Sequence, residues 1–234
     1  MIDIHAHIIP FVDDGSSSLE DSIRLIETEV EQGVTDIVCT PHYDINRHYV
    51  ATNTDIDKNF HLLKTEVEKQ NISVNLYLGR EIHLEPRIWH MVEKGELKTI
   101  NDSRYVLLEL FDTVFPFDID EIVFEFSVGK YKLVLAHPER YTFLNYDDLV
   151  AWKKRGIYLQ INAASFFSTN KAWGKLMSRL LKARLIDFVS SDIHTFRKNM
   201  MLDAFNYVSK LCGVEYADKI FHTNAQKVLN NELI

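Results

Sequence analysis

Short apolar runs alternate along the chain with longer amphipathic segments. The runs are rich in Val, Ile, Leu and Tyr, which is typical of strands buried on both faces. We predict seven strands, at residues 2–7, 36–40, 73–79, 105–110, 132–137, 158–162 and 187–191. The segments between and after them have the length and polarity of helices, at residues 19–32, 54–70, 86–94, 119–128, 146–155, 171–183 and 200–211.

The first predicted helix carries specific start and stop signals. Ser17 precedes it and Glu20 follows three positions later, which is the pattern of a capping box. Gly33 stands at its far end, where a residue with a permissive backbone is favoured. We therefore expect a helix that is capped by Ser17 and stops at Gly33.

Seven alternations of strand and helix predict parallel strands joined by helical crossovers. No repeat, low-complexity stretch or Pro-, Gly- or Ser-rich linker divides residues 1–234, so we expect a single domain. The length suits a closed, TIM-like barrel. An open, doubly wound sheet would give the same local pattern, so periodicity alone leaves both architectures open.

Residues that bind metals stand at or just after the ends of the predicted strands. His5 and His7 come first, and residues i and i+2 of a strand point to the same face. In a parallel barrel all strand ends open onto one face, whereas an open sheet spreads them along an edge. The clustering therefore favours the barrel. The nine candidate ligands are His5, His7, Asp14, His42, Glu81, Glu109, His137, Asp192 and His194.

This mixture of imidazole and carboxylate without thiolate suits manganese, iron or zinc. With one bridging carboxylate, nine ligands could hold two or three divalent ions. A metal-bound or bridging water becomes hydroxide near neutral pH, so hydrolysis is the expected reaction class. The other histidines are interpreted as surface or core residues. Among them, His83 stands two positions beyond Glu81 and is left outside the ligand set.

The charge of the expected metal site narrows the class of substrate. Four of the nine ligands are carboxylates, so three divalent ions would give the loaded site a charge of about +2, while a phosphate monoester carries roughly −1.5 to −2. Arg140 and Arg197 lie within five positions of a ligand. Guanidinium groups bind phosphate oxygens in bidentate geometry, although a surface ion pair is the alternative for either arginine.

Composition excludes other classes. The net charge of −8 and the absence of a basic tract argue against a nucleic-acid-binding surface. No apolar run is long enough to cross a bilayer, and no basic region followed by an apolar signal core opens the chain, so we expect a cytoplasmic location without membrane insertion. Cys39 and Cys212 are expected to be reduced thiols. Neither has an arginine six positions later, which excludes the nucleophilic loop of cysteine-based phosphatases.

Several segments resemble those of the PHP (polymerase and histidinol phosphatase) superfamily, and within it the CpsB-type bacterial tyrosine-protein phosphatases of capsule and exopolysaccharide operons. The resemblance covers essentially the whole chain, and the HPERY segment together with HxH and DDG is specific to this subgroup. The segments are His5-Ala6-His7, Asp13-Asp14-Gly15, Thr40-Pro41-His42, Gly79-Arg80-Glu81, His137-Pro138-Glu139-Arg140-Tyr141, Gln160-Ile161-Asn162 and Ser191-Asp192-Ile193-His194.

The resemblance implies a distorted (β/α)7 TIM-like barrel, the PHP fold, with a trinuclear and often manganese-dependent centre. By position, one ion would be held by His5, His7, Glu81 and Asp192. Glu81 would bridge to a second ion at Glu109 and His137, and a third would bind Asp14, His42 and His194. Arg140 would bind phosphate with Arg197 assisting. The implied substrate is a tyrosine autokinase that controls polysaccharide biosynthesis. Arg80 departs from the family, whose members usually carry Gln there.

Two other functions stay open at this point. One is a phosphatase for a small ester such as histidinol phosphate, and the other is a regulator that binds phosphotyrosine without turnover. Aromatic side chains in the predicted loops could flank a phenyl ring or could simply pack those loops. They are Tyr43, Tyr49, Phe111, Phe115, Phe117, Phe166 and Phe167.

Overall fold

The computed structural model describes residues 1–111 and 119–234. Within these residues every strand pair is parallel, as the sequence predicts, and the strands form two sheets. The first sheet has the order β1-β2-β4, with β1 (Ile2–Ala6), β2 (Asp36–Cys39) and β4 (Asn75–Leu78). The second has the order β3-β5-β6-β7-β8-β9, with β3 (His42–Tyr43), β5 (Glu81–His83), β6 (Tyr105–Glu109), β7 (Lys132–Ala136), β8 (Tyr158–Asn162) and β9 (Phe188–Ser190).

All seven predicted strands are present, and the structure adds β3 and β5. These two short strands continue β2 and β4 after the Thr40-Pro41 and Gly79-Arg80 steps. The pairing of β2 with β4 is thereby carried on by the pairing of β3 with β5, where His42 lies opposite Glu81. Two and three residues are too few for a hydrophobic period, which is why the sequence pattern does not predict them.

Hydrogen bonds also connect β1 with the chain that follows β9. The Asp192 N–H donates to the His5 carbonyl at 2.9 Å, and the His7 N–H donates to the Ile193 carbonyl at 3.1 Å. Ala6 and Ile193 form a parallel bridge between these segments. An edge strand of one sheet is therefore bonded to the segment that follows an edge strand of the other.

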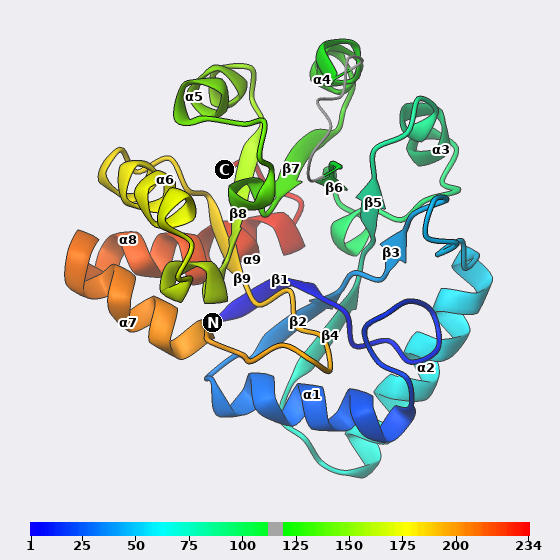
Figure 1. Cartoon of the computed structure of the whole chain (residues 1–234). Coiled ribbons are helices and arrows are strands. Elements are labelled where there is room, and N and C mark those ends of the chain that lie inside the picture. The colour runs from blue at the N-terminus through cyan, green and yellow to red at the C-terminus, as the bar shows by residue number, and fades with distance from the viewer. Residues whose placement is uncertain (112–118) are drawn as a thin grey trace.

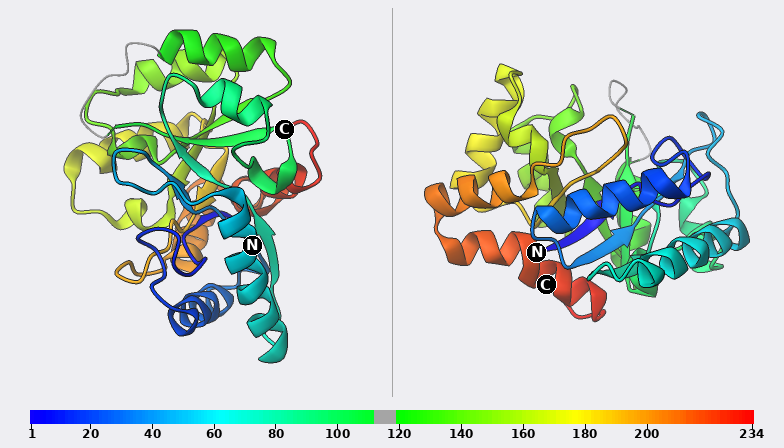
Figure 2. Two further views of the ribbon diagram at one scale, coloured as in Figure 1. Left: turned by 90° about the vertical axis from the view of Figure 1, so that its right-hand side faces the viewer. Right: turned by 90° about the horizontal axis from the view of Figure 1, so that it is seen from below.

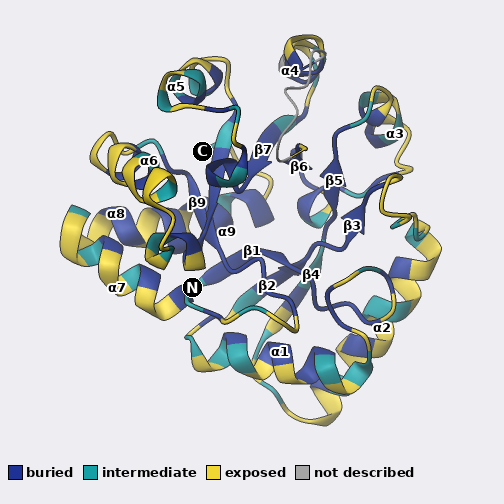
Figure 3. Ribbon diagram, viewed as in Figure 1, coloured by how far each residue is buried: buried dark blue, intermediate teal, exposed yellow. Residues whose placement is uncertain are grey.

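Helices lie around the outside of the strands (Figure 1) and turn their buried sides toward them (Figure 3). All seven predicted helices are present, with ends within two residues of the expected bounds. None of the described helices combines the length and apolarity that crossing a bilayer requires. The seven are α1 (Leu19–Glu31), α2 (Asn53–Lys69), α3 (Ile88–Glu93), α4 (Ile119–Val128), α5 (Tyr146–Lys154), α6 (Lys171–Lys182) and α7 (Met201–Cys212).

The cap of α1 corrects the sequence prediction by one residue. Ser18, not Ser17, has the extended backbone of an N-cap, and its hydroxyl accepts the N–H of Asp21 at 3.0 Å. Ser17 donates instead to the Asp21 side chain. Two serines in succession offer the same chemistry, so only the local backbone decides between them. Gly33 ends the segment with a φ of +81°, as expected.

A further helical stretch beyond the predicted elements covers one end of the strands. It comprises α8 (Val214–Asp218), η4 (Lys219–Thr223) and α9 (Asn224–Leu229). Val228 and Leu229 of α9 belong to an inner apolar cluster with Ile4, Leu107 and Val134. The left view of Figure 2 shows α9 in red on the opposite side of the strands from the orange loop after β9. Apolar side chains thus fill the interior near the strand starts, which leaves the carboxyl ends for polar residues. Three single turns complete the fold: η1 (Ile100–Asp102), η2 (Pro138–Arg140) and η3 (Ala163–Phe167).

Candidate metal centre

All nine candidate ligands come together at the carboxyl ends of the strands. Eight of them are buried, and only Asp14 is substantially exposed, with 37% of its side chain accessible. β1, β3, β5 and β6 position His5, His42, Glu81 and Glu109 within the strands. The other ligands lie in the segments directly after β1, β7 and β9: His7, Asp14, His137, Asp192 and His194.

One group of four side chains surrounds a single point. His5 Nε2 and His7 Nε2 lie 3.1 Å apart, and each lies 3.1–3.2 Å from Glu81 Oε2. Asp192 Oδ1 lies 3.6 Å from His5 Nε2 and 3.5 Å from His7 Nε2. Ligands that share one ion are spaced by about 3 to 3.5 Å when each bond is about 2.1 Å. The spacing of these four atoms fits one metal ion.

The second carboxylate oxygen of Glu81 belongs to a second group. Glu81 Oε1 lies 2.9 Å from His137 Nε2, which in turn lies 3.8 Å from Glu109 Oε1. Glu109 also approaches His42, whose Nδ1 lies 3.6 Å from Glu109 Oε2 and 3.0 Å from Glu81 Oε2. Glu81 therefore stands between two groups of donors, as a bridging carboxylate does.

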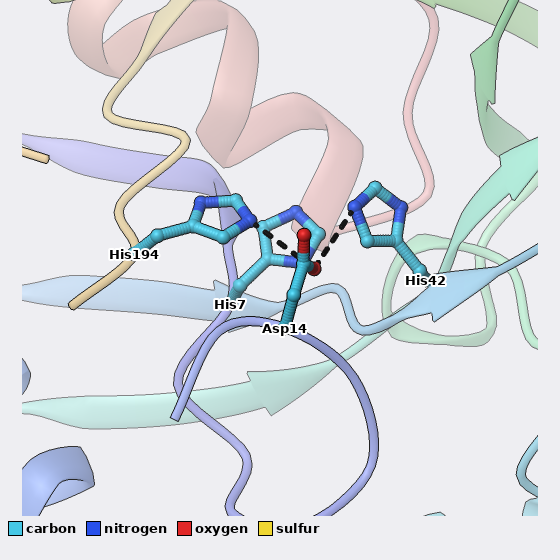
Figure 4. A group of neighbouring side chains, drawn as sticks. All are labelled: His7, Asp14, His42 and His194. Atoms are coloured by element: carbon cyan, nitrogen blue, oxygen red, sulfur yellow. Dashed lines mark ion pairs between the residues drawn. The ribbon is translucent and has the colours of Figure 1, made fainter. Parts of the chain in front are cut away.

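Asp14 is the centre of a third group, shown in Figure 4. Its Oδ1 lies 3.5 Å from His42 Nε2 and 3.6 Å from His194 Nε2. His7 completes the set of donors that lie within 4.8 Å of one another. Asp14 is carried on the loop after β1, and this loop runs close to the strand because Gly15 has no side chain. A Cβ at Gly15 would lie 2.1 Å from the His7 carbonyl oxygen.

An extra residue in β1 helps to aim its histidines. From Asp3 to Ala6 the chain takes three steps, while the paired strand β2 takes two steps from Ile37 to Cys39. Such an irregularity re-aims the side chains that follow it. Ile4 can therefore join the inner apolar cluster while His5 reaches the metal-binding groups.

Partners behind the imidazoles fix which nitrogen faces the site. His7 Nδ1 donates to Asp13 Oδ2 at 2.8 Å, and His5 Nδ1 donates to Gln160 Oε1 at 3.0 Å. In the neutral form of each ring, Nε2 is then the nitrogen without a proton, and it faces Glu81 Oε2. Lone pairs that meet in this way repel one another unless a cation lies between them, so the donor set fits a metal. Asp13 and Gln160 were not predicted to orient these histidines, although both lie in segments that carry the family resemblance.

The electrostatics also favour positive charge at this point. Burial opposes ionisation of Glu81, but His5, His42 and His137 hold its pKa well below the usual value. Burial and the repulsion of Glu81 raise the pKa of Glu109 to about 7. Burial also lowers the pKa of His137, with the help of Arg140, to about 4. A neutral imidazole between two carboxylates is the protonation state that a metal ligand requires.

Two candidate ligands have a backbone conformation that non-glycine residues rarely adopt. The φ angle is +34° at His137 and +50° at Asp192. Such a conformation costs about 1–3 kcal/mol and persists where the surroundings over-determine it. Asp192 is held by its N–H bond to His5 and by the Asn162 amide, which donates to Asp192 Oδ2 at 2.7 Å. Strain just after β7 and just after β9 is typical of a functional site.

Comparison with known proteins shows which family this chain belongs to. A model of the capsular polysaccharide synthesis family CpsB/CapC matches residues 1–230. The chain belongs to the CpsB/CapC family.

Relatives of this CpsB/CapC family member are named for an activity. It is 32% identical to the tyrosine-protein phosphatase CpsB of Streptococcus agalactiae over the full length of both chains. It is 30% identical to the tyrosine-protein phosphatase YwqE of Bacillus subtilis, covering all of this chain and 93% of that protein. A solved structure described as YwqE from Bacillus subtilis and CpsB from Streptococcus pneumoniae, metal-dependent tyrosine phosphatases, matches with a TM-score of 0.93 at 30% identity. It covers 100% of this chain and 96% of that one.

A more distant structure bears on the small-ester alternative. The histidinol phosphate phosphatase of Lactococcus lactis matches with a TM-score of 0.54 at 14% identity, covering 91% of this chain and 93% of that one. At this identity the likeness shows the fold alone. It does not favour a small substrate for the CpsB/CapC family member.

Both arginines singled out from the sequence lie at Asp192. Arg197 donates to the Asp192 carbonyl at 2.9 Å and pairs with Asp192 Oδ2. Arg140 Nη1 lies 3.6 Å from the same oxygen. The two guanidinium groups also line a cavity of about 500 Å³ together with Asn162, Trp173 and Lys198. None of the nine candidate ligands lines it, but Ser191 and Asn162 in its wall adjoin or contact Asp192. We call it the phosphate cavity after the role proposed below for its two arginines.

The aromatic residues singled out from the sequence divide into two sets. Tyr49 stacks on His42, and Phe111 packs edge-on against His83. Tyr43 is buried in the core, and Phe166 and Phe167 pack against Tyr207 of α7. Packing is thus the role of these last three. Phe115 and Phe117 lie outside the described residues.

Two aromatic residues near the site were not predicted. Phe196 is 69% exposed, with its ring centre 5.1 Å from that of His194. Trp173 lines the phosphate cavity from α6. The exposed Phe196 sits one residue before Arg197, a sequence signal that could have been used. The local sequence does not predict that Trp173 lines a cavity, because an apolar residue in α6 is equally expected to pack against the core.

Arg80 and His83 occupy environments that the sequence analysis did not anticipate. Arg80 is buried, donates to the His42 carbonyl at 3.2 Å and lies over the Tyr43 ring, and burial lowers its pKa to about 10. These contacts are made to His42 and Tyr43 of β3. His83 is buried, with a donor atom close to those of Asp44 and Glu109.

Proposed function

We propose that this protein is a metal-dependent protein-tyrosine phosphatase. The observation that carries the proposal is the convergence of nine metal-binding side chains beside two arginines, in a chain whose relatives are named tyrosine-protein phosphatases. The proposed fold is one domain over residues 1–234, in which the two sheets together make a distorted (β/α)7 barrel of the PHP type. The hydrogen bonds between β1 and the segment after β9 support this barrel.

The three groups of donors support three divalent ions, of which manganese is our first choice and iron or zinc the alternatives. His5, His7, Glu81 and Asp192 would hold the first ion. Glu81, Glu109 and His137 would hold the second. Asp14, His42 and His194 would hold the third. Bound there, divalent ions supply an activated water and neutralise the phosphate oxygens.

The protein's own groups bind and orient the phosphate. Arg140 and Arg197 present guanidinium donors at the mouth of the site, where they bind phosphoryl oxygens and stabilise the charge that develops on them. Asp192 fixes both arginines, since each contacts its carboxylate. Asp13 and Gln160 hold His7 and His5 in the tautomer that keeps Nε2 unprotonated. No side chain is needed as a covalent nucleophile, so a phosphoenzyme is not expected.

The phosphate cavity supports an aromatic ester over a small polar one. Trp173 lines it, and the exposed ring of Phe196 lies beside His194, so aromatic surface borders the arginines. We further propose that the substrate is a tyrosine-phosphorylated protein, the tail of a tyrosine autokinase that regulates capsular or exopolysaccharide biosynthesis. The proposed location is the cytoplasm, where the enzyme would bind such a tail.

Turnover with defined metal content tests the function. The chain is stripped with a chelator, reloaded with Mn²⁺, and assayed with a phosphotyrosine peptide and with L-histidinol phosphate. We expect hydrolysis that depends on Mn²⁺, with a higher kcat/KM for the peptide. Faster hydrolysis of histidinol phosphate would favour the small-ester phosphatase. Peptide binding without hydrolysis by a chain that retains no metal would favour a non-catalytic regulator.

A further inference from the structure

A second cavity lies next to the phosphate cavity. It has a volume of about 390 Å³ and is bordered by Leu144, Tyr146, Leu176, Lys175 and Arg179. We call it the side cavity. Its apolar walls come from α5, α6 and the turn between η2 and α5. None of the nine candidate ligands and neither phosphate-binding arginine lines it.

The two cavities share a wall. Trp173 lines both of them. Glu139 lines the side cavity and its neighbour Arg140 lines the phosphate cavity, so a single turn, η2, separates them on the other side. Glu139 is held in this wall because its Oε1 accepts the Asn162 N–H at 3.0 Å. A bound peptide that has one residue at Arg140 can therefore place a neighbouring residue in the side cavity, on the far side of Trp173.

The charge along this path is opposite to that of the whole molecule. The complete chain has 34 acidic and 26 basic residues. The described residues that line the two cavities include five cations, Arg140, Lys175, Arg179, Arg197 and Lys198, and the carboxylate Glu139. Asp192 pairs with Arg140 and Arg197, and Asp147 lies 3.8 Å from Arg179, so the cations still outnumber the carboxylates. Positive potential confined to one part of an acidic surface attracts anionic partners to that part.

We propose that the side cavity binds the segment of a phosphopeptide that flanks its phosphotyrosine. An apolar side chain of this segment enters between Leu144 and Leu176, while acidic neighbours face Lys175 and Arg179. The inference rests on the proposed phosphatase function and adds a preference for apolar, acidic flanking sequence. Recognition of a flanking residue in a pocket beside the reacting one is the usual way in which extended peptides are discriminated.

Filling the side cavity tests this proposal. Ala172 is exposed and lines the side cavity but not the phosphate cavity, so Ala172→Trp occupies the space intended for the peptide. Ser178→Trp is the matched control, because Ser178 is an exposed residue of the same helix that lines neither cavity. The Mn²⁺-loaded enzymes are compared on free phosphotyrosine and on an acidic phosphotyrosine peptide with a leucine beside the phosphotyrosine.

We expect Ala172→Trp to lower kcat/KM for the peptide about tenfold or more, mainly through KM, and to leave free phosphotyrosine within twofold. Ser178→Trp should match the wild type on both substrates. Lys175→Glu provides a second variant without added bulk and should weaken the acidic peptide more than a neutral one. Equal changes on peptide and free phosphotyrosine, or no change on either, would overturn the inference. A wild-type enzyme that fails to hydrolyse free phosphotyrosine would instead refute the phosphatase function.

Discussion

Glu81 turns its two carboxylate oxygens to different histidines. Oε2 lies 3.1 Å from His7 Nε2, and Oε1 lies 2.9 Å from His137 Nε2. Because the two histidines belong to different donor groups, one buried carboxylate links both groups.

Replacing this carboxylate should therefore weaken both metal-binding groups. Glu81→Gln keeps the shape but loses the charge, and we expect at least one fewer Mn²⁺ per chain and a fall in kcat of about a hundredfold or more. Elemental analysis of the purified protein gives the metal content. Glu93→Gln, at an exposed position of α3, is the control. An unchanged metal content would show that Glu81 does not bridge.

Asp13 should act through His7 without binding metal itself. Asp13→Asn removes the charged acceptor of the His7 Nδ1–H, so the ring is held less well in the required tautomer. We expect Mn²⁺ affinity to fall about tenfold to a hundredfold, and excess Mn²⁺ to restore much of the activity. Titration of the metal-free protein with Mn²⁺ measures this. A wild-type titration curve for the variant would contradict the orienting role.

The two arginines should contribute unequally to phosphate binding and turnover. Arg140→Lys keeps the charge but not the bidentate fork, and we expect kcat/KM to fall about a hundredfold and inhibition by inorganic phosphate to weaken. Arg197→Ala should give a smaller loss, since the carbonyl and the carboxylate of Asp192 already engage the Arg197 guanidinium, which leaves it fewer donors for phosphate. Arg24→Ala on exposed α1 controls for loss of positive charge. Unchanged phosphate inhibition in both active-site variants would exclude phosphate binding by these residues.

Much of this site could be predicted from residue order alone, because strand ends converge in a parallel sheet. His5 and Asp192, far apart in the chain, could be grouped before any distance was known. The division of the ligands into three groups came only from family resemblance, since spacing along the chain does not say which oxygen of Glu81 faces which histidine. The contacts of Arg80 could not be predicted, because it lies in the step between β4 and β5, where no strand period applies.

The fold was predictable wherever a segment was long enough to show a period. β3, β5, α8, η4 and α9 were not predicted, because each of these elements is only two to six residues long. The place of Trp173 beside the site could not be predicted for a different reason. Its position beside Arg140 depends on how α6 packs against η2, and no local pattern records such packing.

Gly15 should be required for its small size. Gly15→Ala would place a methyl group against the His7 backbone, and we expect a loss of stability of about 2 kcal/mol or more together with weaker metal binding. Gly174→Ala in α6 meets nothing within 4 Å and should raise the stability by about 0.5–1 kcal/mol. Chemical denaturation of both variants measures the contrast. Equal effects would show that the tight approach at Gly15 is unimportant.

Glu29, buried in α1, should make stability depend on pH. Burial and the nearby Asp3 raise its pKa well above 4.5 in the folded state. A raised carboxyl pKa gives stability that is fully present below the unfolded value and is lost as pH rises through the folded value. Glu29→Gln lacks this loss, so its stability relative to wild type should improve by about 1 kcal/mol or more between pH 5 and pH 8.

Unfolding of both proteins at the two pH values measures the difference. Glu27→Gln, two residues away on the exposed side of α1, should show no such trend. A relative stability of Glu29→Gln that falls with rising pH would contradict the assignment.

Anomalous diffraction from crystals grown with Mn²⁺ and phosphate tests the central claim most directly. The account predicts three manganese peaks, at the groups around His5, His137 and His194, with phosphate in contact with Arg140. Absence of manganese at the Glu81 groups, or phosphate bound away from both arginines, would contradict it.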